Sequence, residues 1–388
     1  MTKRSVYIHI PFCKTKCPYC DFTSFVGCDS QFDNYVAALC NEIKSYANKD
    51  VEIQTVYIGG GTPNLLKPDQ LRKILKTLQK SFHVPDEIET TIECNPALVN
   101  SHLMRSYRNM GINRISIGVQ SMCVKTLNTL GRNQTLHDIG RALFTAAIYF
   151  DNVSIDLMYG VPLESATDKR DYFNELFDFL DTFDHAIKHV SAYSLTLDED
   201  TPMAELIMDD KLLELDEDTH MEEEDQTQFL LRQFGLKRYE VSNFAKPGYE
   251  CQHNMVYWNP SSEYYGFGVS ACGLINDRRY ENTCDLGHYM LRANKIENTL
   301  DRTHHDLINE VIMLSLRTSR GIDLNRLRRM GCDLRIKKAK EIYHLEALKL
   351  IRVTNRTIRA TTEGFLLLNQ VIAELMFDSP NIQIVSTE

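Results

Sequence analysis

The sequence predicts an α/β fold with a parallel sheet, followed by a smaller helical module. Short β-rich runs alternate with stretches in which apolar residues recur every three or four positions, which is typical of βα units. Motifs of unusual composition follow five of the predicted strands, where the loops of a parallel sheet build active sites. A chain of 388 residues, 43% of them hydrophobic, is long enough for one large domain and an appendage.

Six strands are predicted in the first half of the chain, with helices between them. The strands are 6–11, 55–58, 89–93, 114–119, 153–158 and 190–195, and the helices lie near 32–47, 69–81, 101–109, 135–149 and 169–183. Six units are too few for an eight-fold barrel, so a partial barrel and an open doubly wound sheet both fit. In either fold one rim collects the cysteine cluster and the motifs GGGTPN, ECNP, GVQS and DLMYGVP.

Beyond residue 200 the alternation weakens. A helical region to about 234 leads into a stretch rich in Tyr, Gly and Asn, and helices are predicted at 304–317, 323–329, 335–348 and Thr362–Met376, with a hairpin in LKLIRVTNRTIRAT. We therefore expect a barrel domain at 1–250, a connecting region at 251–303 and a helical, winged-helix-like module at 304–388. Winged helices often bind DNA, but a basic excess of three charges in this module favours packing or a lid.

Composition excludes several classes of protein. A net charge of −10 argues against a nucleic-acid partner, although a nucleic-acid-binding regulator is kept as a third hypothesis. The acidic stretch 198–225 is expected to be the solvated face of surface helices. Without a run of 18 uncharged apolar residues, the protein should be soluble and cytoplasmic. Eleven dispersed cysteines do not fit a secreted disulfide scaffold.

Three cysteines, Cys13, Cys17 and Cys20, are clustered in C-x3-C-x2-C spacing after the first predicted strand. A structural zinc site normally takes four Cys or His ligands in two separated pairs, and no second pair follows here. Judged on the three cysteines alone, a fragment of a zinc knuckle remains an alternative. A four-iron cluster takes four thiolates when it is fully ligated. With three thiolates, one iron keeps an open position.

The segment CKTKCPYC resembles the signature of the radical S-adenosylmethionine (SAM) superfamily. The motifs YIHIPFC, YCDF, GGGTP, ECNP, SIGVQS, LGR, DLMYGVP and YEVSNFA resemble the branch of oxygen-independent coproporphyrinogen III oxidases and heme chaperones of the HemW type. The resemblance runs from about Tyr7 to Gly273, with weaker matches, MLSLRTSRGID and TTEGF, near the C-terminus. It implies a partial (β/α)6 TIM-like barrel, a [4Fe-4S] cluster on the three cysteines, and SAM on the fourth iron.

The resemblance also implies a set of SAM-binding residues. Glycines let backbone groups approach a ligand closely, Glu93 can accept hydrogen bonds from ribose hydroxyls, and Arg132 can contact the SAM carboxylate. Each assignment has an alternative. Glu93 could be a plain strand-end carboxylate, Arg132 could form a structural ion pair, and the tyrosines of the set could serve core packing alone. The full set is Tyr7, Tyr19, Gly60, Gly61, Thr62, Glu93, Gln120, Arg132 and Asp156.

Two features separate chaperone from oxidase within this branch. The oxidases carry a further cysteine two residues after the last cluster ligand, where this sequence has Phe22. The segment HNMVYW resembles the HNxxYW motif associated with heme in the chaperones, which implies heme contacts by His253, Asn254, Tyr257 and Trp258. An imidazole is a common axial ligand and aromatic rings stack on a macrocycle.

Alternatives remain for the heme residues. A histidine satisfied by hydrogen bonds is one, and a Cys251 thiolate ligand is another. The segment YYGFGVSACG departs from a glycine-rich family pattern at Val269 and Ser270, which weakens any assignment there.

The sequence as a whole favours a heme chaperone that binds the cluster, SAM and heme as cargo. Its expected partners are heme-acceptor proteins, membrane-associated respiratory enzymes among them, and a protein that reduces the cluster. The alternative is an oxygen-independent coproporphyrinogen III oxidase, so its standing as an enzyme stays open.

Overall fold

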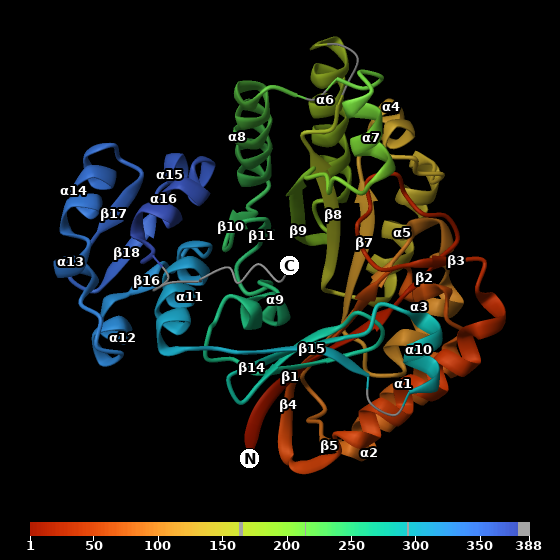
Figure 1. Ribbon diagram of the computed structural model, residues 1–388. Coiled ribbons are helices and arrows are strands. Elements are labelled where there is room, and N and C mark those ends of the chain that lie inside the picture. Colours follow the sequence, from red (N-terminus) through yellow and green to blue (C-terminus); the bar gives the residue numbers. More distant parts are fainter. Residues whose placement is uncertain (163–165, 214, 293–294, 379–388) are drawn as a thin grey trace. The chain divides into compact units, whose positions relative to one another are not determined.

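The computed structural model describes residues 1–162, 166–213, 215–292 and 295–378 (Figure 1). The chain forms two compact units: residues 1–238, 242–253 and 263–300 make the first, and 239–241, 254–262 and 301–388 the second. Residues 263–300, expected in a connecting region, thus group with the barrel. The three-part division stays a prediction, and residues 379–388 of the expected module lie outside the described residues.

The first unit is built on six parallel strands whose order in the sheet follows their order in the chain. A doubly wound sheet would reverse that order at a switch point, whereas a barrel wall adds each strand beside the one before it. The predicted partial barrel is confirmed, and all six predicted strands are present. They are β1 (Thr2–Ile10), β4 (Asn48–Gly60), β6 (Glu89–Cys94), β7 (Arg114–Gln120), β8 (Val153–Tyr159) and β9 (Ile187–Ser194).

Further strands extend this sheet at both edges. At one edge β12 (Tyr264–Phe267) pairs in parallel with β1, and β13 (Cys272–Ile275), β14 (Arg278–Asn282) and β15 (Ile296–Asp301) follow it. At the other edge β11 (Asn243–Ala245) pairs antiparallel with β9, and β10 (Lys237–Arg238) lies beside it. Three short strands complete the unit: β5 (Phe82–His83) on β4, and the separate pair β2 (Phe12–Cys13) and β3 (Phe25–Val26).

Helices follow the strands as βα units require (Figure 1). The helix α5 begins with a capping box in which Thr135 and Asp138 satisfy each other's backbone amides. The helices of this unit are α1 (Phe32–Ser45), α2 (Pro68–Ser81), α3 (Ser101–Arg108), α4 (Val124–Thr129), α5 (Leu136–Tyr149), α6 (Ala166–Phe183), α7 (Pro202–Met208), α8 (Glu217–Gln233) and α10 (Leu286–Leu291). The boundary between the units passes through α9 (Gln252–Tyr257).

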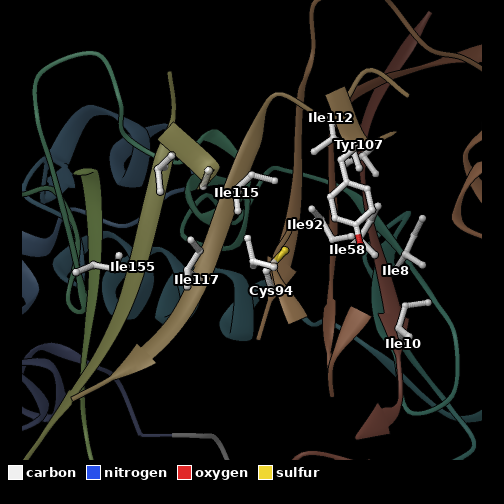
Figure 2. Close-up of a cluster of buried hydrophobic side chains, with 14 of the residues drawn as sticks. Ile8, Ile10, Ile58, Ile92, Cys94, Tyr107, Ile112, Ile115, Ile117 and Ile155 are labelled. Atoms are coloured by element: carbon white, nitrogen blue, oxygen red, sulfur yellow. The ribbon is translucent and has the colours of Figure 1, made fainter. Parts of the chain in front are cut away.

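The core between sheet and helices takes every second residue of the barrel strands (Figure 2). Ile8 and Ile10 come from β1, and Ile115 and Ile117 from β7, and they join Tyr107 of α3 in one buried cluster. Successive side chains of a strand point to opposite faces. The residues between these apolar positions therefore point to the inner face of the barrel.

The acidic stretch 198–225 includes α7 and most of the first half of α8. Most of its described carboxylates are exposed, as expected for a solvated face. Two are not: Glu223 is buried and accepts a hydrogen bond from the Gly160 amide (2.8 Å), and Glu224 pairs with Arg238 (2.8 Å). These two interactions connect α8 to the residue that follows β8 and to β10. Among the described residues, no helix combines the length and apolar character needed to span a bilayer.

The second unit has its own core and a three-stranded sheet in the order β16-β18-β17. Its predicted helices and hairpin are present, except that the helix predicted at 335–348 breaks at Lys338 and the last helix breaks at Leu367. The elements are α11 (His304–Leu316), β16 (Ile322–Asp323), α12 (Leu324–Arg329), α13 (Leu334–Lys337), α14 (Ala339–Ala347), β17 (Ile351–Val353), β18 (Thr357–Ala360), α15 (Thr362–Leu366) and α16 (Leu368–Leu375).

Candidate cofactor site

The three clustered cysteines lie on the loop after β1, at the rim where the parallel strands end. Cys13 ends β2, and the Cys20 amide donates to the Cys17 carbonyl (3.1 Å) in a tight turn. All three are free thiols and partly exposed. Burial, with the neighbouring Cys17 and Cys13 side chains, raises the pKa of the Cys20 thiol above its ordinary value. One short loop thus presents three sulfur donors.

The GGGTP segment lies against this loop because its glycines have no side chain. A Cβ on Gly61 would lie 2.8 Å from the Phe12 carbonyl oxygen and 2.9 Å from the Cys13 sulfur. Gly60 has a φ of +115°, and a Cβ there would lie 2.6 Å from the His9 ring. The Thr62 hydroxyl donates to the Cys13 sulfur at 3.6 Å. Only glycine allows this approach at residues 60 and 61.

The inner face of the barrel is polar, which the contacts across the strands show. The Thr55 hydroxyl donates to Ser5 (2.8 Å), and Ser154 bonds with His189 (2.8 Å). These residues are buried, whereas Tyr7, Tyr57, Glu93 and Asp156, nearer the C-terminal rim, are partly exposed. Solvent therefore reaches the rim half of the inner face, beside the cysteine loop.

Glu93 ends β6 on this inner face and accepts two hydrogen bonds. The Tyr57 hydroxyl donates to Oε1 (2.9 Å) and the Gly60 amide to Oε2 (3.1 Å). Burial and the nearby Asp156 raise the pKa of Glu93 to about 7, against the lowering effect of those hydrogen bonds and of Arg114. The carboxyl is therefore poised between its neutral and charged forms near neutral pH.

Asp156 on β8 is the second carboxylate of the inner face. It accepts a hydrogen bond from Ser116 (3.1 Å) on β7. Burial raises its pKa, although bonds from Ser191 and Ser116 and the charge of Arg114 act in the opposite direction. Arg114 is 1% exposed, and the charge of this buried guanidinium lowers the pKa of both carboxylates. It offsets part of the cost of charging them.

Arg132 and Tyr19 form a pair that joins the segment after α4 to the cysteine loop. Two guanidinium nitrogens of Arg132, Nε and Nη2, donate to the Tyr19 hydroxyl at 3.0 and 2.6 Å. Burial and the thiols nearby raise the pKa of Tyr19 to about 12, so the hydroxyl stays protonated. The predicted SAM residue Arg132 is thus held beside the cluster loop.

Gln120 ends β7 in a left-handed conformation. Its φ is +67°, and the pairing of β7 with β8 shifts register between Gly118 and Gln120. A residue other than glycine in this region is strained, and such strain is typical of functional positions. Tyr7 bonds through its hydroxyl to His9 (3.0 Å) on the same strand. Gln120 thus lies at a strand end and Tyr7 at an inner position of the barrel, and SAM contacts by either residue stay a prediction.

The four residues of the HNxxYW motif do not share one environment. His253 is 1% exposed, and its Nδ1 lies 2.7 Å from the Thr55 hydroxyl. Burial lowers its pKa to about 3, so the ring is neutral. Asn254, Tyr257 and Trp258 are partly exposed. In the second unit, the Arg317 guanidinium lies over the Trp258 ring at 6.0 Å.

The structure brings together most of the predicted SAM residues and adds two that motif comparison missed. The Tyr57 hydroxyl bonds to Glu93, and the charge of Arg114 lowers the pKa of both Glu93 and Asp156. The signal for both was in the sequence, since each is a polar side chain at the inner-face position of an otherwise apolar strand.

The residues present fit a cluster and a SAM molecule. Three free thiols on a rim loop match the donor set of a site-differentiated four-iron cluster. Gly60 and Gly61 let the GGGTP backbone pack against His9 and the cysteine loop, where a Cβ would collide. Within the described ranges, no three His, Cys, Asp or Glu side chains are grouped to hold a single metal ion, whereas a four-iron cluster takes one thiolate on each iron.

Comparison with family models gives two matches. Residues 7–176 match the radical SAM superfamily, and residues 303–367 match the HemN C-terminal domain. Among solved structures, the coproporphyrinogen III oxidase HemN from Escherichia coli covers 97% of this chain and 90% of its own, with a TM-score of 0.82. At 23% identity this likeness concerns the fold.

Curated relatives are more similar in sequence. The heme chaperone HemW of Lactococcus lactis is 31% identical over 387 residues, which cover 97% of this chain and 98% of that protein. The heme chaperone HemW of Escherichia coli is 35% identical over 295 residues, 73% of this chain and 74% of that protein. The chain therefore belongs to the radical SAM superfamily and, within it, to the family of the heme chaperone HemW.

Proposed function

We propose that this protein binds a [4Fe-4S] cluster, SAM and heme, and delivers the heme to acceptor proteins. The observation that carries the proposal is the similarity to heme chaperones over nearly the whole chain, 31% identity across 97% of its length. The free thiols on the barrel rim and the glycine segment packed against them support it.

Cys13, Cys17 and Cys20 would ligate three irons of the cluster, and the open iron would take SAM. A bound cluster, reduced by a partner protein, would supply one electron for reductive cleavage of the SAM sulfonium, with methionine as the leaving group. In this role Thr62 stabilises the Cys13 sulfur with its hydroxyl. Gly60 and Gly61 let the backbone approach the ligand.

The other SAM contacts would come from the rim half of the inner face. Glu93, in its ionised form, accepts hydrogen bonds from ribose hydroxyls. Arg132, held by Tyr19, offers a charge-assisted bond to the SAM carboxylate. The same region holds the further proposed contacts Tyr7, Gln120 and Asp156.

Heme would be bound by the HNxxYW segment. Asn254, Tyr257 and Trp258 are partly exposed and offer an amide and two aromatic rings. His253 remains a proposed ligand, but its ring lies against Thr55 and Tyr57, so coordination requires it to leave that position. The recipients would be heme-acceptor proteins, membrane-associated respiratory enzymes among them. A cytoplasmic location, where thiols stay reduced, and a reductant protein complete the proposal.

The deciding experiment offers the anaerobically reconstituted protein both heme and coproporphyrinogen III. We expect about four irons per chain, a heme spectrum that saturates, and no decarboxylated product, with Cys17→Ala as the control that loses iron. Phe22, 60% exposed after the last cluster cysteine, has no thiol to offer there. Sustained decarboxylation of coproporphyrinogen III would replace the chaperone proposal with the oxidase alternative.

A further inference from the structure

His253 is built into the barrel wall of the first unit. Its Nδ1 bonds with the Thr55 hydroxyl of β4 (2.7 Å), and its backbone amide donates to the Glu89 carboxylate of β6 (2.9 Å). Its ring stacks on the Tyr57 ring, with centroids 5.2 Å apart and planes 26° from parallel. A neutral, buried imidazole thus lies against Tyr57, and the Tyr57 hydroxyl donates to Oε1 of Glu93.

Tyr57 is in contact with two rings. The His253 ring lies 5.2 Å from it and the Tyr7 ring of β1 lies 6.2 Å from it, 26° and 25° from parallel. Its hydroxyl donates to Glu93 at 2.9 Å. The direction of that hydrogen bond depends on the orientation of the ring, and the ring is oriented by its stacking partners.

We propose that His253 is a positioning residue of the SAM site, whose imidazole holds the Tyr57 ring so that the Tyr57 hydroxyl donates to Glu93. The inference rests on the proposed role of Glu93 in binding SAM. It gives the histidine of the HNxxYW motif a task within the barrel, separate from iron coordination. Tyr57 and His253 thereby join Glu93 as parts of one hydrogen-bonded and stacked unit.

The charge state of Glu93 supplies a readout. Asp156 on β8 raises its pKa, whereas Tyr57, the Gly60 amide and Arg114 on β7 lower it. Tyr7 and Cys94 also lie near Glu93. Their own pKa values are raised, so both side chains stay neutral. Losing the Tyr57 hydrogen bond therefore moves the pKa of Glu93 above about 7. The pH at which ionised Glu93 becomes available to ribose then rises as well.

Three variants separate the ring of His253 from its hydrogen bond. His253→Gln keeps a polar partner for Thr55 but removes the ring, whereas His253→Phe keeps a ring and loses the bond. Thr55 retains a partner in either case, since its hydroxyl also bonds to Ser5 (2.8 Å). Tyr57→Phe removes the hydroxyl and leaves the stack. Combining His253→Gln with Tyr57→Phe tests whether the two act through one interaction.

A matched control is available on the same inner face. His189 on β9 is also fully buried, and its Nδ1 bonds with a hydroxyl, that of Ser154 (2.8 Å). β9 lies four places from β4 in the sheet order. His189→Ala removes an equally buried imidazole, so it reports the general cost of such a loss without the stack on Tyr57.

The first measurement is SAM affinity of the reconstituted full chain by equilibrium dialysis from pH 6 to 8.5. We expect His253→Gln and Tyr57→Phe each to weaken binding about tenfold near pH 7, as for one lost bond to a charged group, and the double variant no further. Both should move the pH midpoint upward. His253→Phe should stay near wild type, and His189→Ala should lower thermal stability without moving the midpoint.

A second measurement needs no SAM. Hydrogen exchange of the β6 amides reports how the stability of this strand depends on pH. Ionisation of Glu93 lowers that stability near pH 7, and the pH at which the loss occurs should be higher in His253→Gln than in wild type. An unmoved midpoint in His253→Gln, or His253→Phe as impaired as His253→Gln, would overturn the inference. If wild type binds no SAM, the proposed function fails, and the exchange step still decides the role of His253.

Discussion

Replacing Glu93 by Gln removes a carboxyl group whose pKa the fold raises to about 7 from an ordinary 4.5. A raised carboxyl pKa means that the fold favours the neutral acid. Its contribution to stability is therefore complete below about pH 4.5 and is lost as the pH rises through about 7. The difference corresponds to about 3 kcal/mol at most, because each pKa unit is worth about 1.4 kcal/mol and the side chain is partly exposed.

The free energy of unfolding of Glu93→Gln should therefore equal that of wild type near pH 4.5 and exceed it by up to about 3 kcal/mol at pH 8. Hydrogen exchange of β6 and β7 amides measures this, since comparison of the two proteins at one pH cancels the intrinsic exchange rates. Asp138→Asn is a control of opposite sign, because hydrogen bonds from Thr135 lower the pKa of Asp138. A difference between Glu93→Gln and wild type that does not change with pH would refute the reasoning.

Three other substitutions test the site and the second unit. Gly61→Ala should reduce iron content after reconstitution, because its Cβ would lie 2.8 Å from the Phe12 carbonyl; full iron incorporation would contradict this. Tyr19→Phe should weaken SAM binding about threefold to tenfold by freeing Arg132, as dialysis would show, and unchanged affinity would remove the pair from the site. Arg302→Ala should cost about 1.5–3 kcal/mol in exchange of α11 amides, since it removes the bond between Arg302 and the partly buried Glu310 (2.7 Å), and a loss below about 0.5 kcal/mol would contradict this.

The barrel was predictable because its signal is local. Each of the six strands carries apolar residues at alternate positions and is followed by a helix of recognisable period. The strands β12 to β15 were not predicted. The run YYGF is short and contains glycine, and its partner β1 lies more than 250 residues away in the chain, so no local pattern announces the pairing. The boundary expected at residue 250 was placed just before the HNxxYW segment, well after the alternation weakens near residue 200, and residues 263–300 group with the barrel.

The candidate site was predictable where a motif marked it and hidden where only tertiary contacts define it. The cysteine loop, the glycines and Glu93 lie together on the rim, as the strand order requires. The burial of His253 was not predicted, although a hydrogen-bonded core histidine was among the alternatives. Its environment comes from Thr55 and Tyr57, about two hundred residues earlier in the chain. Which residues bind the cluster, SAM or heme stays a prediction.

The alternation of apolar and polar residues along the barrel strands also limits how this gene can change in length. A single codon inserted within β6 ahead of Glu93 would turn that carboxylate toward the helices and bring Cys94 to the inner face. The same exchange would follow in β7 for Ser116 and Ile117. Insertions and deletions should therefore be tolerated in the loops and rejected inside these strands, whatever residue they add.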